Sequence, residues 1–534
     1  MKKILTLTAV FCFLATAIFA QSRYVDEIFT DVTVTSDVPY GQNYTVLTWA
    51  TSGSSTLQTL VMDFYEPTGD TEAERPLVIL LHTGNFLPNP QNAGTTGTMR
   101  DSVIVEFANR LAKMGYVAAV ADYRTGWNPA APSQEERALT LIQASYRGMQ
   151  DTRTCIRFFK QDYAMNNNSY NVDTSRITVF GQGTGGYISL GTGNLDDYNE
   201  ILLQKFITQA SGQPVPMIVE SINGDIYGTS TGVIPTGFGL PFEGDTLCIP
   251  NYVDYSSDYQ LTVNVGGALG DTSWIDENST PMISFQTPKD PFAPYMEDVL
   301  IVPTTGDLIV EVQGAGLIIP KANELGVNDI MKAAFYNDPY TTAANAVNGG
   351  NEGLYPMYRP TYPNPQDPTD PITEGSPWDW WDAAYWSQIP HPSCPSGVPV
   401  NLCNFHTINS INNPDMSATK ARTYIDTIIG YFAPRACAVL DLPCSTVSTE
   451  PIVSDNVQLL VAPNPANEYV RFTSKAGEQI LSIELYDLNG RLVQNHYNIN
   501  NAQFDLNRNG LTTGLYFAKV RFEDGITSEK IMFE

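Results

Sequence analysis

The stretch RITVFGQGTGGYISLGTG, residues 176–193, decides the fold class of the chain. Its first five residues favour a buried strand, the glycines that follow favour a tight turn, and the residues from Thr184 onward favour the start of a helix. The residue in the middle of the turn is Gly183. A strand, a tight turn and a helix in direct succession are typical of an α/β fold.

Strands and helices also alternate on both sides of this stretch. Continuous apolar runs predict strands covered on both faces, as in a parallel sheet. These runs are residues 77–81 and 117–121, and the alternation resumes after the first insertion with the strands expected at 259–265, 280–286 and 307–313. A final amphipathic helix is expected to end at Pro434, because proline lacks the N–H group that would continue it. The prediction is a doubly wound, mostly parallel sheet.

The α/β domain is expected to occupy residues 21–443 and to contain two irregular insertions. Residues 191–258 are rich in Gly, Pro, Asn and Asp, which predicts an inserted cap. A second irregular insertion is predicted at residues 317–414.

The residue pattern of the sequence changes near the C-terminus. Residues 444–456 form a polar linker, and residues 457–534 contain short alternating strands. Asn489-Gly490 and Asp524-Gly525 are hairpin dipeptides. This pattern predicts a small all-β domain, an immunoglobulin-like sandwich.

The N-terminus and the charge balance restrict location and partners. Residues 1–20 have the basic start, apolar run and final small residue of a secretory signal peptide. No later stretch approaches the roughly 18 apolar residues of a membrane-spanning helix. Without Lys2 and Lys3, 27 basic residues face 57 acidic ones, and no basic cluster interrupts the acidity. A nucleic-acid partner is therefore excluded, and the few scattered histidines predict no metal site.

Six cysteines remain after the predicted signal peptide. An even number in an exported chain suggests disulfides, and proximity favours Cys394 with Cys403 and Cys437 with Cys444. The alternative, that some of these thiols are free and buried, stays open.

The C-terminal domain resembles a known family. The pieces PNPANEYVRF, IELYDLNGRLV, GLTTGLYFAKV and SEKIMFE are similar to the type A sorting domain of cargo of the bacterial type IX secretion system. The resemblance implies that residues 457–534 engage that secretion machinery, and that the protein reaches the outer-membrane cell surface or is released. An unrelated adhesion sandwich is the alternative.

Residues 55–435 resemble the α/β-hydrolase fold in its carboxylesterase and lipase branch. The pieces LVMDFYEP, LLHTGNF, VAAVADYR, DTSRITVFGQGTGG and TPMISFQTPKDPFAPY occur in the family's order. The resemblance implies a serine in a G-x-S-x-G turn, a histidine, an acid and donors for an oxyanion. Fold alone does not establish function.

Gly183 stands where the family places its nucleophilic serine. Glycine adopts the strained backbone of this turn freely, so the substitution predicts that the fold is kept and the chemistry is lost. The side chain of Thr184 leaves the turn in another direction and is not expected to substitute. The backbone N–H groups of Gly84, Asn85 and Thr184 are expected to converge as an anion-binding nest, with or without catalysis.

The acid position corresponds to Asp290, which is also readable as an ordinary turn aspartate. The family's histidine is expected just after the last strand, near Gly314–Leu317, where the sequence has none. His391 and His406 lie in the second insertion, and His406 is the better candidate because it is closer to the final helix. Both also fit ordinary loop residues.

A literal G-x-S-x-G occurs as GTSTG at residues 228–232, around Ser230. A polar segment precedes it, and prolines and glycines follow where a helix is needed. We interpret it as a turn of the cap, with Ser230 as an alternative nucleophile.

The second insertion concentrates aromatic and acidic residues. Its tryptophans could form a platform for a flat ligand or could anchor a long loop; they are Trp378, Trp380, Trp381 and Trp386. The carboxylates of Asp367, Asp370 and Glu374 could hold Ca²⁺, although their spacing matches no known loop. No other cofactor is expected.

The leading hypothesis is an exported protein with a catalytically impaired α/β-hydrolase domain that binds an acyl, glycan or peptide ligand. The first alternative is an active esterase or lipase-like hydrolase that uses Ser230 with His406 and Asp290. The second is a structural surface or adhesion component.

Overall fold

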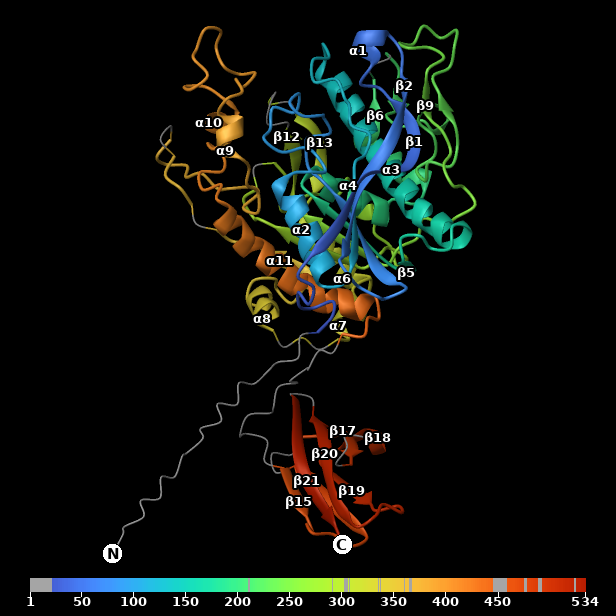
Figure 1. Cartoon of the computed structure of the whole chain (residues 1–534), viewed down its shortest axis with the longest axis vertical. Coiled ribbons are helices and arrows are strands. Elements are labelled where there is room, and N and C mark those ends of the chain that lie inside the picture. The colour runs from blue at the N-terminus through green and yellow to red at the C-terminus, as the bar shows by residue number, and fades with distance from the viewer. Residues whose placement is uncertain are drawn as a thin grey trace, which may run out of the picture. The chain divides into compact units, whose positions relative to one another are not determined.

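A computed structural model describes residues 22–209, 212–290, 292–301, 306, 308–334, 336, 338–359, 361–364, 367–444, 459–474, 478–487, 492–522 and 525–534. The chain divides into two compact units, Met1–Ala333 with Ala344–Thr446 and Ala334–Ala343 with Val447–Glu534 (Figure 1). The predicted signal peptide, the predicted linker beyond Cys444, and Asn489-Gly490 lie outside the described residues.

An eight-stranded sheet in the order β1-β2-β4-β3-β5-β10-β11-β14 forms the centre of the first unit (Figure 1). Its strands are β1 (Val32–Thr45), β2 (Thr56–Pro67), β3 (Arg75–Leu81), β4 (Val117–Ala121), β5 (Val172–Gln182), β10 (Leu261–Val265), β11 (Met282–Gln286) and β14 (Leu354–Pro356). β2 is antiparallel to both β1 and β4, and every other neighbouring pair in this sheet is parallel. The prediction of a mostly parallel α/β sheet is confirmed.

Helices cover both faces of this sheet. The main ones are α2 (Ser102–Lys113), α3 (Gln134–Met165), α4 (Thr184–Asn194), α6 (Ala315–Glu324) and α11 (Ala418–Val439). The Phe180 ring of β5 lies 4.9 Å from Phe107 of α2 and 6.0 Å from Phe432 of α11. Val179, which points to the opposite face, belongs to the core cluster that contains Ile188 of α4 and also residues of α3. Burial on both faces explains why the strands read as continuous apolar runs.

Two expectations about this unit were wrong. α11 continues through Pro434 to Val439, because the buried Phe432 and Arg435 hold its last turns against the rest of the unit. The run at 307–313 forms β13 (Leu308–Gln313), which pairs with β12 (Glu297–Ile301) in a separate antiparallel sheet. The last strand of the central sheet is β14, which lies inside the predicted second insertion.

The chain has further short elements before Cys444. They are α1 (Trp49–Ser52), η1 (Tyr198–Ile201), η2 (Gln204–Phe206), β6 (Ile207–Thr208), β7 (Val215–Pro216), α5 (Glu220–Asn223), β8 (Gly232–Val233), β9 (Thr246–Cys248), η3 (Thr272–Trp274), α7 (Asp329–Lys332), α8 (Pro339–Asn345), α9 (Ala383–Trp386) and α10 (Phe405–Asn409). α4 reaches Asn194, so the first insertion, which we call the cap, runs from 195 to 260.

The predicted disulfides Cys394–Cys403 and Cys437–Cys444 are both present, and Cys155 and Cys248 are free and buried.

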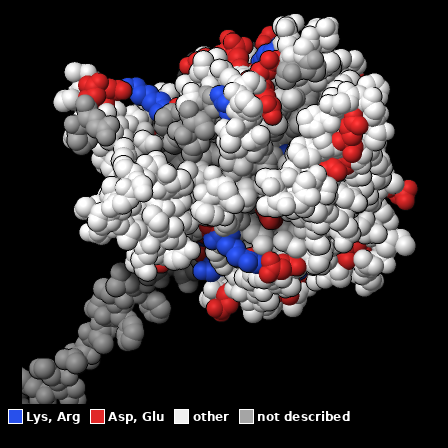
Figure 2. Space-filling view, turned by 90° about the horizontal axis from the view of Figure 1, so that it is seen from above, with Lys and Arg blue, Asp and Glu red and all other residues white. Residues whose placement is uncertain are grey.

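One face of the molecule carries only scattered charged side chains (Figure 2). On the face seen in Figure 2, most residues are neither acidic nor basic, and the charged side chains lie in small scattered groups. The acidic excess of the composition is therefore not concentrated on this face.

The C-terminal unit contains two antiparallel sheets, which confirms that it is all-β. One has the order β15-β16-β19 and the other β18-β17-β20-β21. Their strands are β15 (Leu459–Ala462), β16 (Tyr469–Ser474), β17 (Ile480–Tyr486), β18 (Leu492–Asn501), β19 (Gln503–Asn507), β20 (Gly514–Phe522) and β21 (Gly525–Phe533). Their alternate residues form one buried core, which includes Phe472, Ile483 and Val520.

Candidate active-site cavity

The turn between β5 and α4 keeps the backbone of a nucleophile turn around Gly183. Gly183 has φ +56° and ψ −117°, and its N–H donates to the Val265 carbonyl over 2.8 Å. A side chain is strained at this φ. A Cβ atom added at Gly183 would lie 2.8 Å from Thr83 Cβ and closer still to Thr83 Oγ1. A serine at this position would therefore require the Thr83 side chain to shift.

Two of the three N–H groups expected to form an anion nest, those of Gly84 and Asn85, converge on one point, and a side chain of the protein occupies that point. The N–H groups of Gly84 and Asn85 both donate to Thr184 Oγ1, over 3.1 and 2.9 Å. The Thr184 N–H donates to Thr83 Oγ1 over 3.3 Å. An oxyanion would have to displace the Thr184 hydroxyl from these donors. Sequence reasoning missed Thr83, although its place directly after His82 was visible.

Asp290 lies four residues after β11, at the acid position, and lines the cavity. Its Oδ1 accepts N–H groups from Phe292 over 2.7 Å and Ala293 over 3.1 Å. A Cβ atom on Gly266 would lie 3.8 Å from Asp290 Oδ2, which places this oxygen over the end of β10. Burial raises the pKa of Asp290 to about 7, although the two N–H donors and Arg359 act in the opposite direction.

The expected histidine position changes because β14, and not β13, is the last strand of the sheet. The residues after Pro356 are Met357, Tyr358 and Arg359, so this position also lacks a histidine. Arg359 instead pairs with Glu374, with 3.2 Å between Nη1 and Oε2.

Of the histidines in the described ranges, His391 alone lines the cavity. Its Nδ1 accepts the Ser393 N–H over 3.1 Å, and its Nε2 lies 3.0 Å from the Ala93 carbonyl. Both ring nitrogens are therefore engaged. The preferred candidate, His406, does not line the cavity, and its Nδ1 accepts Trp381 Nε1–H over 3.3 Å.

Ser230 lies in a turn of the cap. Its Oγ accepts the Asp225 N–H over 2.8 Å, and the short strand β8 follows at Gly232, where a nucleophile turn needs a helix. Ser230 is not among the residues that line the cavity with Asp290.

A cavity of about 440 Å³ opens between Gly183, Thr184 and Asp290. The four predicted platform tryptophans do not share it. Trp381 lines it, Trp378 is completely buried, and Trp380 and Trp386 line a second cavity of about 410 Å³. Trp381, Thr95 and Thr96 line both cavities, so the two are neighbours.

Asp379 is a second cavity carboxyl that sequence reasoning did not identify. It is 8 % exposed, lines the larger cavity, and its Oδ1 accepts Gln182 Nε2–H over 3.2 Å. Burial raises its pKa to about 8, with further contributions from Asp101 and Asp290 and an opposing one from Lys420. Its position between two tryptophans, in PWDWW, was the available signal.

Two of the three predicted calcium ligands, Glu374 and Asp367, are engaged by other groups. Glu374 accepts Lys420 Nζ–H over 3.1 Å as well as Arg359, and Asp367 accepts the Thr369 N–H over 2.9 Å. Over the described residues, no three His, Cys, Asp or Glu side chains form a group that could hold a metal ion.

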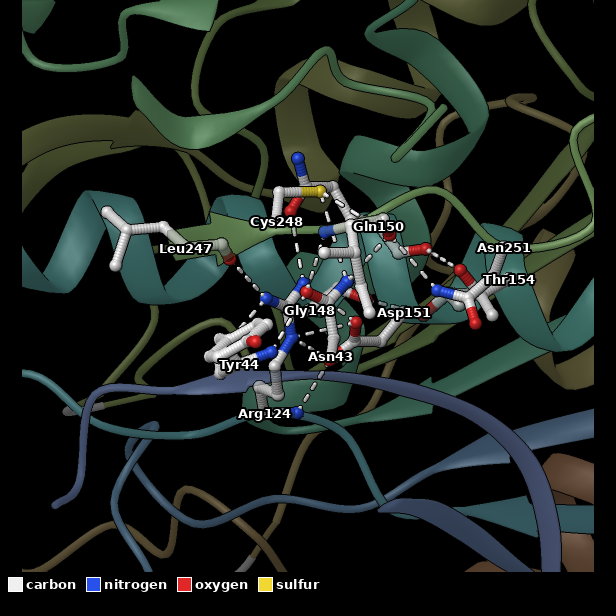
Figure 3. Close-up of polar contacts among 12 residues, drawn as sticks. Asn43, Tyr44, Arg124, Gly148, Gln150, Asp151, Thr154, Leu247, Cys248 and Asn251 are labelled. Carbon is white, nitrogen blue, oxygen red and sulfur yellow. Dashed lines mark hydrogen bonds and ion pairs between the residues drawn. The ribbon is translucent and has the colours of Figure 1, made fainter. Parts of the chain in front are cut away.

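A buried polar network fixes the cap to α3 (Figure 3). Arg124 Nη2 lies 2.8 Å from Asp151 Oδ1, and both side chains are fully buried. Arg124 also donates to the Leu247 carbonyl over 2.8 Å, and Gln150 donates to the Asp225 carbonyl over 2.8 Å. Bonds from core side chains to cap carbonyls hold the cap in one position, and the cap in turn forms a wall of the cavity.

Two protein families match separate parts of the chain. BD-FAE, an esterase-like α/β-hydrolase family, matches residues 62–222, which include Gly84 and Gly183. The secretion system C-terminal sorting domain matches residues 460–534. The chain carries an esterase-like domain and a secretion sorting domain. The sorting domain indicates interaction with the type IX secretion machinery and export to the cell surface or medium.

Solved esterase structures resemble the esterase-like domain weakly. A truncated carbohydrate esterase from gut microbiota is 16% identical, with 50% of this chain and 81% of that chain covered and a TM-score of 0.27. Thermogutta terrifontis esterase 2 phosphorylated by paraoxon is 16% identical, with coverages of 49% and 73% and a TM-score of 0.26. No curated protein matches the chain. Within the described ranges, none of the helices is long and apolar enough to cross a membrane.

Proposed function

We propose that the esterase-like domain has lost ester hydrolysis and acts after export as a ligand-binding protein. The observation that supports this most directly is that two threonine side chains occupy the positions that a nucleophile and an oxyanion would need. Thr83 lies against Gly183 where a nucleophile would stand, and Thr184 Oγ1 accepts the two N–H groups that would stabilise an oxyanion.

The remaining triad positions support the same proposal. Asp290 keeps the acid position, but the residues after β14 contain no histidine, and the two ring nitrogens of His391 are engaged. Loss of the nucleophile or the base alone costs about 10⁶ in rate in a serine protease. Loss of both leaves a preformed cavity of about 440 Å³, within the usual range for small-molecule sites. An acyl, glycan or peptide ligand remains compatible with its size.

The test is hydrolysis of p-nitrophenyl acetate and butyrate by the full chain, with fluorophosphonate labelling of the same samples. We expect no turnover above buffer and no label, in the unmodified protein and in Gly183→Ser alike. Turnover that disappears in Ser230→Ala would overturn the proposal in favour of an active hydrolase using Ser230. Turnover that survives Ser230→Ala would overturn it in favour of a different nucleophile.

A purely structural surface component is the remaining alternative. A binding protein gains thermal stability from its ligand, since the ligand binds only the folded state. A screen of acyl, glycan and peptide compounds that never shifts the melting temperature would favour the structural role.

A further inference from the structure

The larger cavity has two chemically different walls. One is apolar and comes from α3, the cap and the β12–β13 hairpin. It includes Leu141, Met149, Ile201, Phe206, Ile218 and Val312. The other is polar and comes mainly from the region between β14 and α11. It includes Ser376, Asp379, His391, Asn409 and Asn413. A ligand that fits both walls has an apolar part and a polar head.

Two carboxyl groups line the cavity, and in each of them one oxygen has no hydrogen-bond partner among the described residues. Asp290 uses Oδ1 for two backbone N–H groups, and Asp379 uses Oδ1 for Gln182. Among the described residues, no donor hydrogen-bonds to the Oδ2 atom of either carboxyl. Neither Oδ2 is a fully buried atom without a partner, so each keeps some accessible surface. The Asp379 residue is only 8 % exposed. Because Asp379 also lines the cavity, its second oxygen is available to a donor that enters there.

Among the described residues, no lysine or arginine lines the cavity beside these two carboxyls, although Arg359 lowers the pKa of Asp290 and Lys420 lowers that of Asp379 from outside the lining. The nearest basic groups, Arg359 and Lys420, both pair with Glu374, over 3.2 and 3.1 Å. Burying a carboxylate without a counter-charge is costly, so without a ligand these groups are held partly in the neutral form. A positively charged ligand would supply the missing counter-charge.

We propose that this cavity binds an amphipathic organic cation, whose ammonium group pairs with the Asp290 and Asp379 carboxylates. The apolar part of the ligand lies against α3 and the cap. An ammonium group carries three donors and no acceptor, which matches two unpaired carboxylate oxygens. A carboxylate head is disfavoured because it would meet like charge. This inference rests on the proposed binding function and names its ligand class.

The test compares hexylammonium, 1-hexanol and hexanoate, which share one apolar chain and differ only in the head group. Each is titrated by calorimetry into the full chain at pH 8, where the amine is charged. We expect hexylammonium to bind at least about tenfold more tightly than the other two, as for a charge-assisted hydrogen bond. Equal or tighter binding of hexanol or hexanoate, or no binding of hexylammonium, would overturn the inference.

Asp379→Asn and Asp290→Asn keep the shape of the cavity and remove one charge each. Each is expected to weaken hexylammonium binding about tenfold and to leave hexanol unchanged. Asp298→Asn, which removes an exposed carboxylate on β12 outside the cavity, is the matched control and should bind like the parent. Unchanged binding in both cavity variants would overturn the inference. The comparison of the three compounds on the parent protein needs no variant to fold.

Failure of this inference and failure of the proposed function give different signals. Tight hexanoate binding without hydrolysis would keep the binding function and replace the cation by an acyl ligand. Hydrolysis of p-nitrophenyl butyrate by the same preparation would overturn the binding function itself.

Discussion

Thr83 lies directly against the backbone of Gly183, where a Cβ atom would be 2.8 Å from Thr83 Cβ. The contact joins the loop after β3 to the turn before α4. In a serine hydrolase the same two segments supply the oxyanion donors and the nucleophile. Here Thr184 Oγ1 accepts the N–H groups of Gly84 and Asn85, and Thr83 Oγ1 accepts the Thr184 N–H, so the two segments hydrogen-bond to each other.

Gly183→Ser should therefore destabilise the protein by more than its backbone strain alone, which is about 1–3 kcal/mol. Thr83→Gly removes the overlapping side chain, so the double variant should recover part of the loss. Urea unfolding of the parent, both single variants and the double variant measures this coupling, which we expect to be about 1–3 kcal/mol.

Gly237→Ser is the control for backbone strain without overlap. Gly237 has φ +85°, and a Cβ atom there would meet nothing within 4 Å. If Gly183→Ser costs no more than Gly237→Ser, or if the double variant is strictly additive, the overlap with Thr83 has no energetic consequence.

The Arg124–Asp151 pair should be essential for stability. Both side chains are completely buried, so Asp151→Asn leaves the Arg124 charge without its partner and should cost about 3–5 kcal/mol. Asp37→Asn should cost at most about 1 kcal/mol, because Asp37 and Arg100 are 61% and 51% exposed. Thermal unfolding of the two variants checks the contrast, and similar losses would contradict it.

Stability should fall as pH rises from about 4 to about 8. Burial raises the pKa of Asp290 to about 7 and that of Asp379 to about 8, whereas an unfolded aspartate titrates near 4. Between these values the folded state binds more protons than the unfolded state, so their stabilising contribution is complete below about pH 4 and is lost through pH 8. The loss is at most about 1.4 kcal/mol per pH unit for each carboxyl.

Charged neighbours shift the pKa values of these two carboxyls. Arg359 lowers the pKa of Asp290, Lys420 lowers that of Asp379, and Asp101 and Asp290 raise that of Asp379. Urea unfolding from pH 4 to pH 8 should show a smaller slope for Asp379→Asn than for the parent, while Asp298→Asn should keep the parental slope. A parental slope in Asp379→Asn would mean that this carboxyl does not carry the pH dependence.

The two free cysteines should be unreactive in the folded chain. Cys155 and Cys248 are buried, and burial raises the pKa of each thiol, although Arg124 and Asn43 act in the opposite direction at Cys248. The thiolate is the reactive form. We expect Ellman's reagent to find no fast thiol in the native chain without residues 1–20 and two thiols in denaturant. A fast thiol in the native chain would contradict the burial of one of them.

Local patterns predicted much of this fold. The apolar run at 117–121 coincides with β4, and the strand, turn and helix around Gly183 are present as β5 and α4. Continuous burial on both faces leaves a clear mark in the sequence, because most residues of such a strand are apolar. β13 shows no such continuous burial. Val310 and Val312 are buried, whereas Leu308 before them and Glu311 between them are exposed.

Two elements depended on contacts that no local pattern contains. β14 has three residues, too few for any periodicity, and only its pairing with β11 makes it the last strand. α11 passes through Pro434 because Arg435 pairs with Glu352 at 2.5 Å and its neighbours are buried. Tertiary packing here outweighs the cost of proline inside a helix.

The sequence by itself determined the alternation of strands and helices around Gly183, the resemblance to two families and the glycine at the turn, because residue types and their spacing carry these directly. Only the tertiary structure decided that Thr83 contacts Gly183, that Thr184 Oγ1 accepts the Asn85 N–H, and that Asp379 joins Asp290 at the cavity. Thr83 and Gly183 are 100 residues apart in the chain, and Asp290 and Asp379 are 89 apart. Such neighbours arise when the sheet and the insertions pack together, and no local propensity predicts them.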